Sequence, residues 1–268
     1  MSQQNRWPIF QVDAFITNKA FSGNPAAVCL LTEPQDEEWM QAIAEEMNLS
    51  ETAFVCACDD GFELRWFTPT IEVDLCGHAT LAAAHVLWEQ NILTPGTTAR
   101  FQTRSGCLQV RQSADWVELD FPAEPVVATK APEALLFALG IKHAEVYRNR
   151  LDYLVTVATV AEVRELTPDF SRLKKVDTRG VMVTAGADDS DVDFASRFFA
   201  PAAGINEDPV TGSAHCALYP FWSERLNKSE MTAFQVSKRG GLLKLRGQEG
   251  RVMIAGRAFT VTSGELHV

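Results

Sequence analysis

The sequence predicts an α+β protein built from two similar halves. Short apolar runs with strand-like alternation occur along the whole chain of 268 residues, and helical patterns interrupt them. One segment of the first half also has a counterpart in the second half. The length fits one large domain or two of roughly 100–150 residues. We expect an N-terminal half at residues 1–122 and a C-terminal half at 123–268, and leave open that the last residues cross back to the first half.

The first half should alternate strands with helices. Trp39, Ile43 and Met47 recur at helical spacing, and Asp36 stands where it can cap the helix that they indicate. The loop between the first two strands contains FSGNP, and Gly61 closes a hairpin turn. The expected elements are strands at 8–15 and 26–31, a helix at 36–47, a hairpin of strands at 51–58 and 62–68, a small-residue helix at 76–91 and three strands within 99–121.

The second half should begin after a linker, PAEPVVATK at 122–130, which carries two prolines. The expected elements are a helix near 131–139, strands near 144–149 and 152–158, a strand at 181–186, a second small-residue helix at 209–222 and three short C-terminal strands.

A weak internal repeat supports the division into halves. WFTPTIEVDLCGHATLAAAHVLW (66–88) is similar to RFFAPAAGINEDPVTGSAHCALYPFW (197–222). Each segment has an aromatic residue, a proline two residues later, an acidic loop, and Gly-polar-Ala opening an Ala-rich helix that ends at Trp. The repeat is too long for a solenoid. It suggests two similar halves that face each other across an active-site cleft.

The two matched loops could bind an anion. The first turn of a helix has N–H groups without intrahelical partners and a partial positive charge, and Gly77 and Gly212 would let a ligand approach the backbone closely. Two such helix ends could hold a small carboxylate or an enolate. The alternatives are ordinary helix capping, a turn shaped by Asp208 before its proline, and a core position for His78.

Glu51 is a candidate acid/base. It lies in NLSETAFV, where a helix gives way to a strand and apolar residues follow. A carboxyl group partly removed from water there would suit proton transfer at neutral pH. The alternative is a solvated glutamate at a strand end, and spacing alone does not select Glu51 from the other acids.

Composition excludes several classes of function. The formal net charge is −11 and no Lys/Arg run exceeds two residues, which argues against nucleic-acid and membrane-surface binding. The N-terminus has no apolar segment of signal-peptide length, so we expect a cytoplasmic protein whose six cysteines are reduced. Cys56 and Cys58 are expected as buried thiols on one strand face. No C-x-x-C pair occurs, and we expect no metal site.

Four motifs resemble the PhzF-like family of phenazine-biosynthesis isomerases. They are FSGNPAAV (21–28), SETAFV (50–55), CGHATLAAAHVL (76–87) and EDPVTGSAH (207–215), in the family's order and over essentially the whole chain. The resemblance implies the diaminopimelate epimerase-like fold, with each half a sheet rolled around a central helix. It also implies a homodimer that uses neither a metal nor an organic cofactor.

The resemblance implies the following site. Glu51 would be the general acid/base that moves a proton within a small unsaturated acid such as trans-2,3-dihydro-3-hydroxyanthranilate. The pocket would be lined by His78, Asp208 and Ser213, and the backbone at Gly77 and Gly212 would hold the substrate carboxylate.

One departure from the wider fold bears on the mechanism. Epimerases of this fold use a cysteine at each matched loop, whereas this chain has Cys76 at the first and Thr211 at the second. The main hypothesis is therefore an isomerase acting through Glu51. The alternatives are an amino-acid racemase or epimerase that uses Cys76 with another base, and a non-catalytic small-molecule binding protein.

Overall fold

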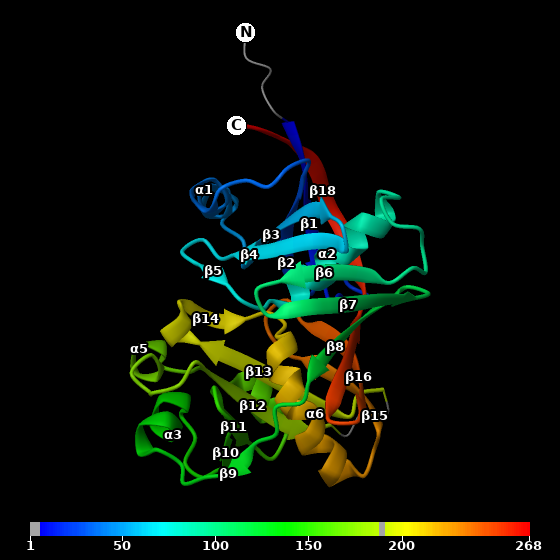
Figure 1. The fold of residues 1–268 in the computed structure, drawn as a ribbon. Helices are drawn as coiled ribbons and strands as arrows, with labels where there is room; N and C mark the ends of the chain where they lie inside the picture. The colour runs from blue at the N-terminus through cyan, green and yellow to red at the C-terminus, as the bar shows by residue number, and fades with distance from the viewer. Residues whose placement is uncertain (1–5, 188–190) are drawn as a thin grey trace. The chain divides into compact units, whose positions relative to one another are not determined.

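The computed structural model describes residues 6–187 and 191–268. The chain divides into two compact units, of which unit 1 takes in Met1–Asp120 and Ala255–Val268, and unit 2 takes in Phe121–Ile254. The last strand of the chain therefore belongs to the same unit as the first (Figure 1). Among the described residues, no helix has both the length and the apolar character needed to cross a membrane.

In the part that the structure describes, unit 1 contains two helices, and its strands come from the N-terminal half and from the end of the chain. Its elements are β1 (Arg6–Ala14), β2 (Asn24–Leu31), α1 (Glu37–Met47), β3 (Glu51–Cys58), β4 (Gly61–Phe67), β5 (Glu72–Val73), α2 (Gly77–Glu89), β6 (Ala99–Thr103), β7 (Gly106–Ser113), β8 (Trp116–Pro122, whose last two residues fall in unit 2) and β18 (Ala258–His267).

The sheet of unit 1 combines antiparallel pairs with two parallel pairs. β1 runs antiparallel to both β18 and β2, and β3 runs antiparallel to β4. The parallel pairs are β2–β3, joined through α1, and β4–β6, joined through α2. The side chain of Asp36 caps α1 by accepting a hydrogen bond from the Trp39 N–H at 2.7 Å, as the sequence predicted.

Helix α2 forms the core of unit 1. Ten of its thirteen residues are buried, on every face of the helix. A helix that is apolar all round needs neighbours on all sides, and α2 packs against β1, β2, β3 and β18 (Figure 1). Ala79, Ala82 and Ala83 have no exposed surface, so small side chains let the strands approach the helix closely.

In its described residues, unit 2 contains four helices and one 3₁₀ turn. Its elements are β9 (Val127–Ala128), α3 (Glu133–Leu139), β10 (Val146–Arg148), β11 (Asp152–Thr156), α4 (Val160–Glu165), α5 (Phe170–Leu173), β12 (Gly180–Gly186), β13 (Phe194–Ala200), η1 (Pro201–Ala203), β14 (Ile205–Asp208), α6 (Gly212–Leu226), β15 (Glu230–Gln235), β16 (Gly241–Gln248) and β17 (Arg251–Gly256, whose last two residues fall in unit 1).

Unit 2 repeats the order of pairings found in unit 1. β10–β11 is antiparallel, β11–β12 is parallel, β12–β13 is antiparallel, and β13–β15 is parallel with α6 as its connection. α6 is the central helix: His215 and Trp222 stack on Phe194 of β13, and the Trp222 indole N–H donates to Thr184 of β12 at 3.0 Å. The predicted α+β fold of two similar halves, each a sheet rolled around a central helix, is confirmed.

Candidate functional site

The FSGNP loop of unit 1 makes a tight turn that places Asn24 at the start of β2. Gly23 has φ +77°, and a Cβ there would lie 2.3 Å from the carbonyl oxygen of Ala14, so only glycine fits. The buried hydroxyl of Ser22 supports the turn by accepting from the Thr17 N–H at 2.9 Å and donating to the Lys19 carbonyl at 2.7 Å. Asn24 itself has no exposed surface.

Glu51 lies next to His78. Parallel pairing of β2 with β3 puts Glu51 opposite Ala26, at the first residue of its strand. His78 is the second residue of α2. The Glu51 Oε2 atom lies 3.2 Å from His78 Nε2, and the two side chains are only 13% and 6% exposed. Sequence reasoning had named both residues, and the structure brings them into direct contact.

The imidazole of His78 is neutral at physiological pH. Burial lowers its pKa to about 3, because the charged ring would be removed from water. Its second nitrogen, Nδ1, lies 3.3 Å from the Asn24 amide nitrogen and 3.5 Å from the Cys76 sulfur. The ring therefore links the acid of β3 to the FSGNP loop and to the residue before α2.

Glu51, Cys76 and His78 also place three possible metal ligands within 4.8 Å of one another. However, Glu51 and Cys76 approach different nitrogens of the ring. One ion could not bind the ring and keep both neighbours without a rearrangement, because the two ring nitrogens point in different directions. The ring therefore has Glu51 near one nitrogen and Cys76 near the other.

In unit 2, a buried glutamine organises the approach to α6. The Gln235 Oε1 atom accepts from the Thr211 N–H at 2.9 Å, and its amide nitrogen donates to the Asp208 carbonyl at 2.7 Å. The Thr211 hydroxyl donates to Asp208 Oδ2 at 2.6 Å. Asp208 is thereby held by its backbone and by its carboxylate, one turn before α6.

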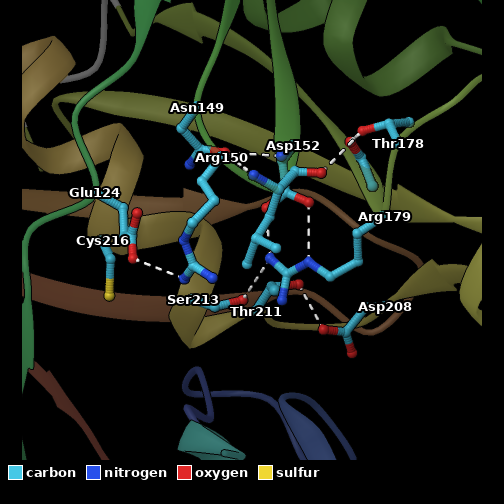
Figure 2. A network of polar contacts seen from close by, with 12 residues as sticks. Glu124, Asn149, Arg150, Asp152, Thr178, Arg179, Asp208, Thr211, Ser213 and Cys216 are labelled. Carbon is cyan, nitrogen blue, oxygen red and sulfur yellow. Dashed lines mark hydrogen bonds and ion pairs between the residues drawn. The ribbon is translucent and has the colours of Figure 1, made fainter.

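Ser213, in the first turn of α6, contacts an ion pair that the sequence had not suggested. Arg179 donates to both carboxylate oxygens of Asp152 and also to Ser213 Oγ at 3.2 Å (Figure 2). Burial opposes the charge on Arg179, but the hydrogen bonds and charge of Asp152 outweigh it and raise the pKa of the guanidinium. Both residues stand directly before apolar runs, YLVT and GVMVTA, which is the one sequence signal that could have found them.

The first turns of α2 and α6 are alike. Each helix begins at a predicted glycine, Gly77 or Gly212. Within the described residues, neither N-cap side chain, that of Cys76 or of Thr211, caps its helix by a hydrogen bond. Backbone N–H groups at such a terminus attract negative charge. Of the predicted site residues, Glu51, Gly77 and His78 lie in unit 1, and Asp208, Gly212 and Ser213 lie in unit 2.

The duplicated α+β fold is also found in a solved epimerase. The crystal structure of a hydroxyproline epimerase from Agrobacterium vitis superposes with a TM-score of 0.67 at 12% identity, covering 100% of this chain and 94% of that one. At that identity, the likeness concerns the fold alone. The expected epimerase-like fold is confirmed.

The chain belongs to the phenazine biosynthesis-like (PhzC-PhzF) family, whose model matches residues 12–264. It is 53% identical over 260 residues to an uncharacterised isomerase of Halalkalibacterium halodurans, covering 97% of this chain and 98% of that protein. The crystal structure of a PhzF family protein from Enterococcus faecalis superposes with a TM-score of 0.94 at 44% identity, covering 98% of this chain and 100% of that one. The protein is an isomerase of this family.

Proposed function

We propose that this isomerase moves a proton between two carbon atoms of a small unsaturated or cyclic amino or hydroxy carboxylic acid, with Glu51 as the general acid/base. The observation that carries the proposal is the contact between Glu51 and the neutral ring of His78. A proton carrier must be held in one orientation and shielded from bulk water, and Glu51 is largely buried beside the ring of His78.

The reaction needs one group that both accepts and returns the proton. The Glu51 carboxylate would take a proton from one carbon, and the electrons of that C–H bond would shift into the neighbouring unsaturation. The protonated carboxyl group would then give the proton to a second carbon, which restores the carboxylate. The reaction consumes neither an oxidant nor a second substrate.

Substrate binding is assigned to the two helix N-termini and to the polar side chains beside them. Backbone N–H groups at Gly77 and Gly212 would bind the substrate carboxylate and the negative charge that develops during proton transfer. Ser213 and Asp208 would contact its hydroxyl or amino substituents. These contacts explain how a chain with a formal net charge of −11 could accept an acid.

A thiol-based racemase is the second candidate, because Cys76 Sγ lies 3.5 Å from His78 Nδ1. Cysteine and histidine in contact can form a nucleophile and its base. Here the lowered pKa of His78 makes its ring a poor acceptor for the thiol proton. Threonine at the matched position 211 also removes the second thiol of a two-cysteine mechanism. Both observations favour Glu51 as the proton carrier.

The test is turnover of trans-2,3-dihydro-3-hydroxyanthranilate, followed by NMR, beside a panel of small cyclic and unsaturated amino acids. We expect isomerisation of at least one compound and competitive inhibition by saturated carboxylates of similar size. If none of the compounds is isomerised and none of the carboxylates inhibits, the proposed substrate class is contradicted.

We further propose that the enzyme acts in the cytoplasm as a homodimer. All six cysteines are free thiols, which suits a reducing compartment. Light scattering at micromolar concentration should give twice the chain mass of 29.6 kDa. A single species at the chain mass would contradict the dimer.

A further inference from the structure

We infer that Asn24, oriented by Ser50, is a positioning residue that fixes the tautomer of His78 and so aims an N–H donor at Glu51. The inference deepens the proposed function, because it assigns two further residues to the same site. It is carried by two contacts that lead from the Ser50 hydroxyl through the Asn24 amide to His78 Nδ1, and by the 3.2 Å distance between His78 Nε2 and Glu51 Oε2.

The series of contacts begins at Ser50, which directly precedes β3. The parallel pairing of β2 with β3 brings the starts of both strands together, and so places Ser50 beside Asn24. The Ser50 hydroxyl donates to Asn24 Oδ1 at 3.1 Å. The structure places the oxygen end of the amide against Ser50 and the NH₂ end toward His78.

The amide then decides which ring nitrogen carries the proton. An NH₂ group can only donate, so His78 Nδ1, at 3.3 Å from the Asn24 amide nitrogen, has to present its lone pair. The Cys76 thiol near the same nitrogen is also able to donate. Since a neutral imidazole carries one N–H, the proton lies on Nε2, which is 3.2 Å from Glu51 Oε2.

Burial strengthens the effect of the Asn24 amide on the tautomer of His78. Asn24 has no exposed surface and His78 is 5% exposed, so water is poorly placed to replace the amide. The other tautomer would put two N–H groups face to face at Nδ1 and leave Nε2 without a hydrogen for the carboxylate. A buried donor opposed by another donor is costly. Asn24 would therefore act on Glu51 only through His78.

The tautomer can be measured without substrate. In nitrogen-15 NMR of the uniformly labelled protein, the His78 signals, assigned by their loss in His78→Gln, should show Nε2–H and an unprotonated Nδ1 in the native protein. In Asn24→Asp, a carboxylate oxygen faces Nδ1 and should bring a proton onto it. The control, Asn91→Asp, makes the same change of charge at an exposed position of unit 1 and should leave the His78 signals unchanged.

Kinetics then test the consequence for the reaction. We expect Asn24→Asp to lower kcat roughly 10- to 100-fold with a much smaller change in KM, as for other partners that orient a site residue. Ser50→Ala should lower kcat less, and Ser50→Thr, which keeps the hydroxyl, should restore it. Unchanged kcat in Asn24→Asp would overturn the positioning role.

The two measurements separate this inference from the proposed function. Protonation of His78 at Nδ1 in the native protein would overturn the inference whatever the substrate is. An Nδ1 that stays unprotonated in Asn24→Asp would overturn it as well. Failure of the substrate panel would instead contradict the proposed function, and the NMR result would still decide how Asn24 and His78 are arranged.

Discussion

The Glu51 carboxylate and the His78 imidazole meet at 3.2 Å, although one begins a strand and the other begins a helix. Because the pKa of His78 is lowered to about 3, the ring faces Glu51 as a neutral group and not as a cation. Much of the expected behaviour of the site follows from this relationship.

The first prediction concerns replacement of His78. Glutamine can still donate an N–H to Glu51, whereas leucine cannot. A hydrogen bond to a charged group contributes about 1.5–3 kcal/mol, so His78→Leu should lower kcat/KM roughly 10- to 100-fold and His78→Gln clearly less. Steady-state kinetics would check this order. Equal losses in both variants would show that donation by the ring is not what the reaction requires.

The second prediction concerns stability at low pH. Burial lowers the pKa of His78 to about 3 and that of His215 to about 4, below the value of about 6.5 for unfolded histidine. Between the pKa values of the folded histidines and the value of about 6.5, the unfolded chain therefore binds more protons than the folded chain. The stability that depends on the neutral rings is complete above about pH 6.5 and is lost as the pH falls toward 4 and then 3.

Urea unfolding between pH 8 and pH 4 would measure this loss. His215→Phe keeps an aromatic ring to stack on Phe194 and should make the unfolding free energy depend less on pH. His143→Gln, at an exposed position, should leave that pH dependence unchanged. A stability independent of pH over this range would contradict the lowered values.

The third prediction concerns the turn that positions Asn24. Gly23→Ala introduces a Cβ at 2.3 Å from the Ala14 carbonyl oxygen, at φ +77°. Gly96→Ala is a matched control, because Gly96 has φ +84° and nothing within 4 Å of the added carbon. The control should lose about 1–2 kcal/mol of unfolding free energy from backbone strain. Gly23→Ala should lose clearly more, and equal losses by chemical denaturation would refute the steric argument.

The fourth prediction concerns the ion pair of unit 2. Asp152 is 2% exposed in its side chain, and Arg179→Ala would leave its charge without this partner. Breaking a buried pair costs roughly 3–5 kcal/mol, and the loss should be at or below that range because Arg179 is 36% exposed. Arg6→Ala, which breaks an exposed pair with Glu265, should cost less than about 1 kcal/mol. Urea midpoints of the two variants would provide the comparison.

The fifth prediction concerns Cys76. If Glu51 is the proton carrier, Cys76→Ser should keep most of the activity, because a hydroxyl can still donate toward His78 Nδ1. A loss of activity in Cys76→Ser as large as that expected for Glu51→Gln would favour the thiol mechanism. The same assay applied to Thr211→Cys should show no gain in racemisation of amino acids.

The fold was predictable because its signals are local. Trp39, Ile43 and Asp36 define α1 by spacing and capping, and the Gly-polar-Ala repeats mark α2 and α6. The strands β13, β14 and β15 and the short helices α4 and α5 were not assigned, because their sequences carry neither clear alternation nor helical spacing. The prediction that Cys58 is buried was wrong: it is the last residue of β3, beside the hairpin turn, and its thiol is exposed.

The contacts of the site depend on long-range pairing, which spacing does not reveal. No local feature distinguishes Glu51 from other acids, and its contact with His78 arises only when β3 and α2 pack together. The same holds for Asp152 and Arg179, which meet across the parallel pair β11–β12. Asn24 lay within a motif recognised by resemblance, yet its place between Ser50 and His78 required the structure.

The most direct test of the central role of Glu51 is deuterium incorporation from heavy water during turnover, in the native enzyme and in Glu51→Gln. Glu89→Gln, at a partly exposed acid of α2, serves as the control. The account predicts deuterium at the product carbon for the native enzyme and the control, and a rate lowered roughly 10²- to 10⁴-fold in Glu51→Gln. Incorporation by Glu51→Gln at the native rate would show that another group carries the proton.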